Sequence, residues 1–204
     1  MSPRAMKALL RALGREAAQD LDRPAEPEAV MRAFCRAMGV RAGRPVELLF
    51  RVFPAEVPVS GLRLDLGDRS VIVVEERTVP EAQLVILGHE LWHEEQGGCG
   101  HRTAGPAAVS ARAGAPSRQV SDAARRAAER ILAETEVERD ALRAVAARAE
   151  SPDEHEVAAE TFGLLFAREA RTWMHGRYAE GPVTPATVEG RMNLSLTNRG
   201  GRLL

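Results

Sequence analysis

The feature that most constrains this chain is a His-Glu-x-x-His pentad at residues 89–93. In an α-helix, His89 and His93 lie on one face about 6 Å apart along the axis, so that both imidazoles can bind one ion. Imidazole nitrogens hold Zn²⁺ at about 2.0–2.1 Å. Glu90 follows the first histidine, where it can act as the general base for a water molecule. The pentad therefore predicts a helix that carries a catalytic metal site.

The residues around the pentad favour a helix buried inside the fold. Residues 83–87 are mostly apolar, Gly88 permits close packing beside the metal, and the spacer residues Leu91 and Trp92 are uncharged. The alternative is a core helix with two ordinary histidines and a surface glutamate. The spacing of the three polar residues favours the metal site over this alternative.

A catalytic zinc takes three protein ligands and keeps one position for water, so a third ligand is required. Cys99 stands six residues after His93, where a histidine could have completed the site. A carboxylate on a later helix is the remaining choice, and Glu156 and Glu160 lie four residues apart on one helical face. We expect Glu156 to bind the metal and Glu160 to accept the free N–H of a ligand histidine, which would fix its tautomer.

Other residues compete for these roles. Glu154 and His155 are rivals for the third ligand position. Cys99 and His101 are close to the pentad in sequence, but a segment rich in glycine, alanine, serine and proline is a poor place for a fixed ligand. The alternative for Glu156 and Glu160 is that they bind no metal and form an acidic pair exposed to solvent on the helix surface.

Composition limits the class of protein. The chain has 204 residues, 45% of them hydrophobic, which is enough for one packed domain. A formal net charge of -1 gives no electrostatic argument for a nucleic acid or an anionic membrane as partner. The cysteines, Cys35 and Cys99, are too few for a disulfide framework, and neither a signal peptide nor a membrane span is evident. We therefore expect a cytoplasmic protein in which Cys35 is a small buried apolar residue.

Hydrophobic periodicity predicts an α+β fold, with a small three-stranded antiparallel sheet packed on a mainly helical domain and the pentad helix at its centre. Strict alternation over Leu62–Leu66 is typical of a strand with one buried face. The predicted strands are residues 45–53, 62–66 and 70–75, and the predicted helices are residues 3–20, 27–38, 80–96, 121–150 and 153–178.

We expect residues 1–180 to form a single domain. Within it, residues 97–118 are rich in glycine, alanine, serine, proline and arginine, which predicts a flexible loop. Residues 181–204 are expected to form a partly mobile C-terminal tail with one short helix near residues 187–192.

The order of a sheet followed by the pentad helix, together with the sequence of residues 87–93, resembles the ImmA/IrrE family of zinc metallopeptidase-like proteins. In that family the pentad is followed by a helix with the pattern Glu-x-x-Ala-(Asn/acid)-x-Phe-(Ala/Gly), and residues 156–163 read Glu-Val-Ala-Ala-Glu-Thr-Phe-Gly. The resemblance covers roughly residues 26–175 and is strongest to an actinobacterial branch of toxin-like or regulatory members. The chain departs from the family at Glu160, where asparagine is usual, and at Glu94 and Glu95, where apolar residues are common.

The resemblance implies a zincin-like fold of the gluzincin type and a cytoplasmic, zinc-dependent endopeptidase that hydrolyses a peptide bond in a protein partner such as a helix-turn-helix repressor. In this hypothesis Glu90 is the general base, the strand at Val71–Val74 receives an extended substrate by edge pairing, and His175 or Tyr178 stabilises the oxyanion. The alternative is a non-catalytic, metal-stabilised regulatory module that sequesters its partner. Neither hypothesis involves direct binding of nucleic acid or of a membrane.

Overall fold

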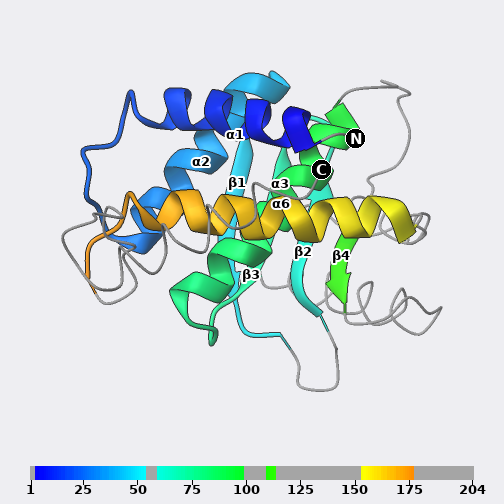
Figure 1. Cartoon of the computed structure of the whole chain (residues 1–204). Helices are drawn as coiled ribbons and strands as arrows, with labels where there is room; N and C mark the ends of the chain where they lie inside the picture. The colour runs from blue at the N-terminus through cyan, green and yellow to red at the C-terminus, as the bar shows by residue number, and fades with distance from the viewer. Residues whose placement is uncertain (1–2, 54–58, 99–108, 114–152, 177–204) are drawn as a thin grey trace, which may run out of the picture.

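The computed structural model describes residues 3–53, 59–98, 109–113 and 153–176, and these residues form an α+β arrangement (Figure 1). The predicted helices that begin at residues 3, 27, 80 and 153 are confirmed, with ends that differ by a few residues. The predicted helices at 121–150 and 187–192, and the C-terminal tail, lie outside the described residues. The helices are α1 (Pro3–Ala17), α2 (Pro27–Ala42), α3 (Pro80–Gly98) and α6 (Asp153–Arg171), and the strands are β1 (Val46–Arg51), β2 (Val59–Asp65), β3 (Ser70–Glu75) and β4 (Val109–Ala113).

The first two helices form because each has an apolar stripe at helical spacing. In α1 the stripe consists of Met6, Leu9, Leu13 and Ala17, all buried. In α2 a proline stands in the first turn, where its missing N–H costs no hydrogen bond, and the buried face includes Phe34 and Cys35. The expectation that Cys35 is a buried apolar residue is therefore confirmed, and burial raises the pKa of its thiol to about 12.

The sheet has the strand order β1-β3-β2-β4. β2 and β3 pair antiparallel, whereas β1 and β3 pair parallel, from Val46 opposite Ser70 to Arg51 opposite Glu75. The predicted all-antiparallel arrangement is therefore wrong. It assumed that strands adjacent in sequence are adjacent in the sheet, but the connection after β1 places β2 on the far side of β3.

β3 is the central strand, and every one of its residues is buried. Its continuous apolar run, Val71–Val74, is the pattern of a strand covered on both faces. Because β1 and β2 occupy its two edges, no backbone group of this strand is left to pair with another chain. The expectation that Val71–Val74 receives an extended substrate is therefore wrong.

β4 lies inside the segment predicted to be a flexible loop. It pairs antiparallel with β2, from Val59 opposite Ala113 to Leu64 opposite Val109, with an irregularity near Gly61. The strand has a weak sequence signal, because serine and alanine have low β-propensity and carry little apolar surface. Its formation depends on the edge that β2 offers, which is a tertiary effect. The loop prediction is wrong for these five residues.

α3 lies between the sheet and α6, and it also packs against α2 (Figure 1). Aromatic rings fill the junction of the helices: Phe34 lies 4.9 Å from both Phe166 and Trp173, and Trp92 lies 5.1 Å from Phe162, between ring centroids. The pentad helix is thus central, as predicted. Among the described helices, none combines the length and the apolar character that crossing a membrane requires.

Candidate metal centre

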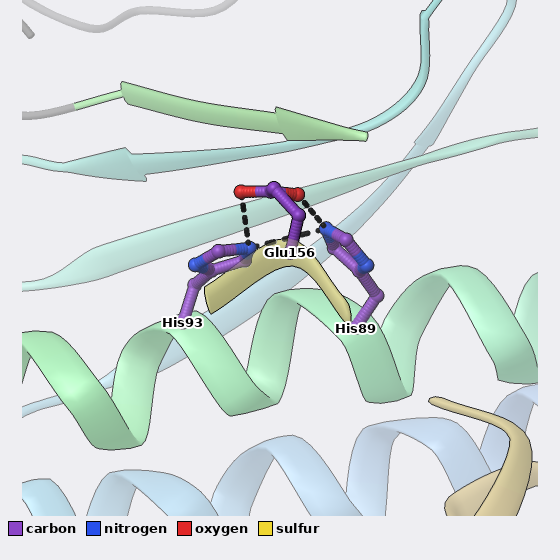
Figure 2. Close-up of side chains that lie close together, drawn as sticks. All are labelled: His89, His93 and Glu156. Carbon is purple, nitrogen blue, oxygen red and sulfur yellow. Dashed lines mark hydrogen bonds and ion pairs between the residues drawn. The ribbon is translucent and has the colours of Figure 1, made fainter. Parts of the chain in front are cut away.

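Three side chains from two helices converge on one point: His89 and His93 from α3 and Glu156 from α6 (Figure 2). The Nε2 atoms of the histidines are 3.1 Å apart. Glu156 spans both, with Oε2 3.4 Å from Nε2 of His89 and Oε1 3.4 Å from Nε2 of His93. Residues 63 positions apart in sequence are thus brought together in the arrangement that the sequence predicted for the metal ligands.

These distances fit a metal ion. In a tetrahedral site with bonds of about 2.0–2.1 Å, neighbouring ligand atoms lie about 3.3–3.4 Å apart. The distance of 3.1 Å between the two histidine nitrogens, and the distance of 3.4 Å from each nitrogen to one of the two oxygens of Glu156, are close to that value. One ligand atom from each residue can be chosen so that all three atoms lie within 4.8 Å of one another. The group can therefore hold a metal ion.

Burial differs across the site. The side chains of His89 and His93 are 1% and 9% exposed, whereas that of Glu156 is 37% exposed. The imidazoles therefore lie in a position fixed by the core, and access from solvent is on the side of α6.

The convergence depends on a close crossing of α3 and α6 at two glycines. A Cβ on Gly88 would lie 2.9 Å from the Cα of Gly163, and a Cβ on Gly163 would lie 2.6 Å from the carbonyl oxygen of Val85. Both distances are too short for a real Cβ. Gly88 directly precedes His89, and Gly163 lies two turns after Glu156, so the contact brings the ligands of the two helices within reach of one another.

Glu160 lies one turn after Glu156 on α6, beside the Nδ1 edge of the His89 ring. Its Oε1 is 3.7 Å from Nδ1 of His89, the nitrogen that does not face the other two ligands. This placement agrees with the predicted role of Glu160 in holding the orientation of His89, although the two atoms are farther apart than in an ordinary hydrogen bond.

Glu90 is fully buried and faces β2. A Cβ on Gly61 would come within 3.1 Å of Oε1 of Glu90, and it would also collide with the side chain of Ile86. Gly61 therefore makes the room that lets α3, with Glu90, lie directly against the strand. The sequence gave no indication of this contact, because Gly61 is not part of any motif.

A buried group of charged residues attaches the C-terminal half of α3 to the sheet. The side chain of Glu94 is 0% exposed and accepts hydrogen bonds of 2.8 Å from Arg44, Arg63 and Ser70. Arg44 also pairs with Asp65 through both of its terminal nitrogens. Two arginines and two carboxylates balance, so that none of these charges is buried without a partner. We call these five residues the Glu94 network.

The network corrects the prediction for β2. The alternating residues Arg63 and Asp65 face α3, whereas Leu62 and Leu64, on the other face, are also fully buried. Both faces of this strand are therefore covered, and the polar residues of the alternation serve an internal ion pair network. The one sequence signal for this network was Glu94, an acidic residue directly after the pentad at a position where apolar residues are common in the family that the chain resembles.

Charge pairing shifts the pKa values in this network. Burial by itself raises the pKa of Asp65, but hydrogen bonds from Arg44 and from the N–H of Gly67 outweigh it and hold the pKa below its usual value. The hydrogen bond to Asp65 is the main reason why the pKa of Arg44 lies above its usual value. Both groups therefore keep their charges over the whole physiological range.

Of the remaining predicted site residues, the structure describes the side chain of only His175, and it does not bring this residue to the metal ligands. His175 lies beyond Arg171, the last residue of α6, which is itself about 22 Å along the helix axis from Glu156. Its Nε2 lies 3.2 Å from Glu26, and its backbone N–H donates to the carbonyl of Ala25. The side chains of Glu154 and His155, and the residues Cys99, His101 and Tyr178, lie outside the described part of the chain.

The geometry of the three ligands is thus the main guide to the function of the chain. No family model matches the sequence, and neither the curated proteins nor the solved structures compared with it give a significant match.

Proposed function

We propose that this chain is a zinc-dependent endopeptidase of the cytoplasm, with a zincin-like fold and an ImmA/IrrE-like site, which hydrolyses a peptide bond in a protein partner. The observation that carries the proposal is the convergence of His89, His93 and Glu156, with interatomic distances close to those of a tetrahedral metal site. Two imidazoles and one carboxylate are the ligand set of catalytic zinc in several peptidases.

The number of ligands supports a catalytic site over a structural one. Structural zinc sites are usually closed by four protein ligands, most often with cysteines, whereas a catalytic site keeps one position open. The described residues supply three ligands, and the partly exposed Glu156 marks an accessible side. When bound, the zinc would acidify a water molecule and polarise the carbonyl of the scissile bond.

Residues of the chain would bind the metal, fix the tautomer of a ligand histidine and transfer the proton. His89 and His93 are neutral when they bind the metal, and Glu160 beside Nδ1 of His89 favours the tautomer in which that nitrogen carries the proton. Glu90 would accept a proton from the attacking water and deliver it to the nitrogen of the leaving amine. The burial of Glu90 keeps bulk water away from that proton.

A protein substrate can reach this site as an extended segment along β4. Within the described residues, β4 pairs only with β2, so its other edge can accept hydrogen bonds from an added strand. Figure 2 shows β4 on the side of the site toward which the ligands point. Edge pairing is thus expected at β4 in place of the central β3. A flexible segment of a helix-turn-helix repressor is a substrate of the required kind.

The Glu90→Gln variant tests the proposal. Purified wild-type and variant proteins are loaded with zinc, their metal content is measured, and hydrolysis is followed with fluorescently labelled β-casein and a quenched-fluorescent peptide library. We expect equal zinc content and a rate at least about 100-fold lower in the variant, because a general base contributes about that much or more. Glu81→Gln, on the first turn of the same helix, is the matched control and should retain wild-type activity.

Two results would contradict the proposal. Hydrolysis that continues unchanged in zinc-loaded Glu90→Gln excludes this residue as the base. Absence of hydrolysis in the wild type, together with tight zinc binding, favours the non-catalytic regulatory module that sequesters its partner.

A further inference from the structure

A groove of about 700 Å³ runs between α1 and the C-terminal half of α6, away from the metal ligands. Arg168, on its rim, lies about 18 Å along α6 from Glu156. The side chains around it are strongly biased toward positive charge, and among the described residues that line it only Glu169 is acidic. The cationic residues of this groove, which we call the basic groove, are Lys7, Arg11, Arg15, Arg23 and Arg168.

The positive charges of the basic groove are not neutralised by the described part of the protein. Lys7, Arg11, Arg15 and Arg168 are exposed, and no carboxylate of the described residues forms an ion pair with any of them. Other surface arginines do pair, such as Arg41 with Glu95. Because the whole chain carries a net charge of only -1, this concentration of unpaired cations is a local feature.

The spacing of these charges is regular. Lys7, Arg11 and Arg15 follow one another at intervals of four residues, so they form a row on one face of α1 with steps of about 6 Å. Like charges at this spacing destabilise a helix by a few tenths of a kcal/mol per pair. The row therefore has a cost for folding and no compensating ion pair within the described residues, which is the pattern of a surface that binds an anionic partner.

The floor of the groove distinguishes between kinds of anionic partner. It contains the half-buried aliphatic side chains of Leu10 and Leu165. Trp173 is only 4% exposed, with the guanidinium of Arg23 4.1 Å from its ring centroid and Gly14 against its edge, so it offers no face on which a nucleic acid base could stack. An apolar floor with a cationic rim is complementary to an amphipathic segment that carries carboxylates.

We propose that the basic groove binds an acidic, amphipathic segment of a partner protein. Carboxylates at every fourth position of a helix, or at alternate positions of an extended segment, would match the row on α1, and aliphatic side chains between them would cover Leu10 and Leu165. The groove is separate from the metal ligands, so this binding does not depend on the proposed peptidase activity.

Fluorescence anisotropy tests the proposal with a labelled amphipathic peptide of glutamate, leucine and alanine that has glutamate at every fourth position. The matched peptide has glutamine in place of glutamate, and oligo-dT and a short DNA duplex serve as nucleic acid probes. We expect the protein to bind the glutamate peptide, to bind the glutamine peptide much more weakly, and to lose affinity as salt rises, since exposed charges are screened. Glu156→Ala should bind the peptide like the wild type.

Charge reversal locates the binding. Arg11→Glu combined with Arg15→Glu should weaken peptide binding at least about tenfold, whereas Arg36→Glu, at an exposed arginine of α2 outside the groove, should change it less than about twofold. All three positions are exposed, so circular dichroism should show unchanged folding. The proposal is overturned if the double variant binds as tightly as the wild type, if no peptide binding is detected, or if oligo-dT or the duplex binds more tightly than the glutamate peptide.

Discussion

At the scale of single residues, the candidate metal centre brings the lone pairs of three side chains close together. The Nε2 atoms of His89 and His93 are 3.1 Å apart, and each lies 3.4 Å from a different oxygen of Glu156. Lone pairs of neutral imidazoles and of a carboxylate that are directed at one point repel unless a proton or a metal ion lies between them. Both histidine side chains are buried, so water does not separate these lone pairs, and the arrangement favours a bound cation.

The role of Glu156 leads to the first prediction. Glu156→Ala should weaken zinc binding by more than about 100-fold, because the loss of a ligand should exceed the effect of losing a residue that only orients one. Competition with a chromophoric chelator measures the affinity. Glu169→Ala removes a carboxylate from the far end of the same helix and should leave the affinity unchanged. If zinc affinity is equal in all three proteins, the third ligand is another residue, with Glu154 and His155 as the first alternatives.

Elements bring the ligands together, and the crossing of α3 with α6 is the decisive contact. It relies on Gly88 and Gly163, where the backbones approach too closely for a side chain. The helices themselves could be predicted, since their signals are local: the pentad and the apolar spacing. Their crossing could not, because a glycine in a sequence does not indicate which segment will pack against it.

Gly163→Ala is therefore the second prediction. The new Cβ would lie 2.6 Å from the carbonyl oxygen of Val85, so the helices must separate. We expect the free energy of unfolding to fall by about 1–3 kcal/mol, as for overpacked cores, and zinc affinity to fall as well. Gly97→Ala is the control, since its Cβ would meet nothing closer than 3.4 Å. Denaturant unfolding and chelator competition measure both effects, and a stable variant with normal zinc affinity would show that the crossing is unimportant.

The sheet shows why other parts of the structure were not predictable. The parallel pairing of β1 with β3 follows from the path of a connection, which leaves no periodic signal. Apart from Val109, β4 consists mainly of small residues with weak β-propensity, and it forms on the edge of β2. Arg63 and Asp65 follow the alternation of a half-exposed strand, yet they face α3 because Glu94 supplies a counter-charge for Arg63 and Arg44 supplies one for Asp65. In each case the missing information is the identity of a partner that is distant in sequence.

The Glu94 network gives the third prediction. Glu94→Gln keeps the shape of the side chain but leaves Arg44 and Arg63 with Asp65 as their one remaining carboxylate in the network, so that one positive charge is uncompensated, which should cost about 3–5 kcal/mol of unfolding free energy. Glu95→Gln changes the next residue, which pairs with the half-exposed Arg41, and should cost no more than about 1 kcal/mol. Urea unfolding compares them. Equal losses in the two variants would mean that the buried network does not stabilise the attachment of α3.

At the scale of the whole molecule, the protein combines a balanced total charge with strong local separation of charge. The paired charges of the Glu94 network are internal and connect the sheet to α3, whereas cations without an ion pair among the described residues gather on the outer surface of α1 and α6. The internal pairs affect the stability of the entire fold because they connect α3 to β2, to β3 and to Arg44 in the turn between α2 and β1. The cations on the surface should affect binding and leave stability nearly unchanged.

The last prediction concerns the stability of the whole fold in acid. The pKa of Asp65 is lower in the folded protein than the value of 3.8 for an unperturbed carboxyl group, so below about pH 4 the unfolded chain binds more protons than the folded one. The contribution of Asp65 is fully present above that range and is lost as the pH falls through the lower pKa of the folded state. The pKa of Glu75 is also lowered, mainly by its hydrogen bond with Arg77, and adds to the same trend.

Urea unfolding of the metal-free protein from pH 5 down to pH 2.5 measures this effect, and a chelator excludes any contribution from the loss of zinc. The unfolding free energy should fall more steeply in the wild type than in Asp65→Asn, because the variant has no proton to gain at this position. Asp68→Asn, at an exposed carboxylate of the β2–β3 turn, should follow the wild-type curve. If Asp65→Asn follows the wild-type curve as well, the pairing of Asp65 with Arg44 contributes nothing to the acid sensitivity, and the carboxylates that cause it lie elsewhere in the fold.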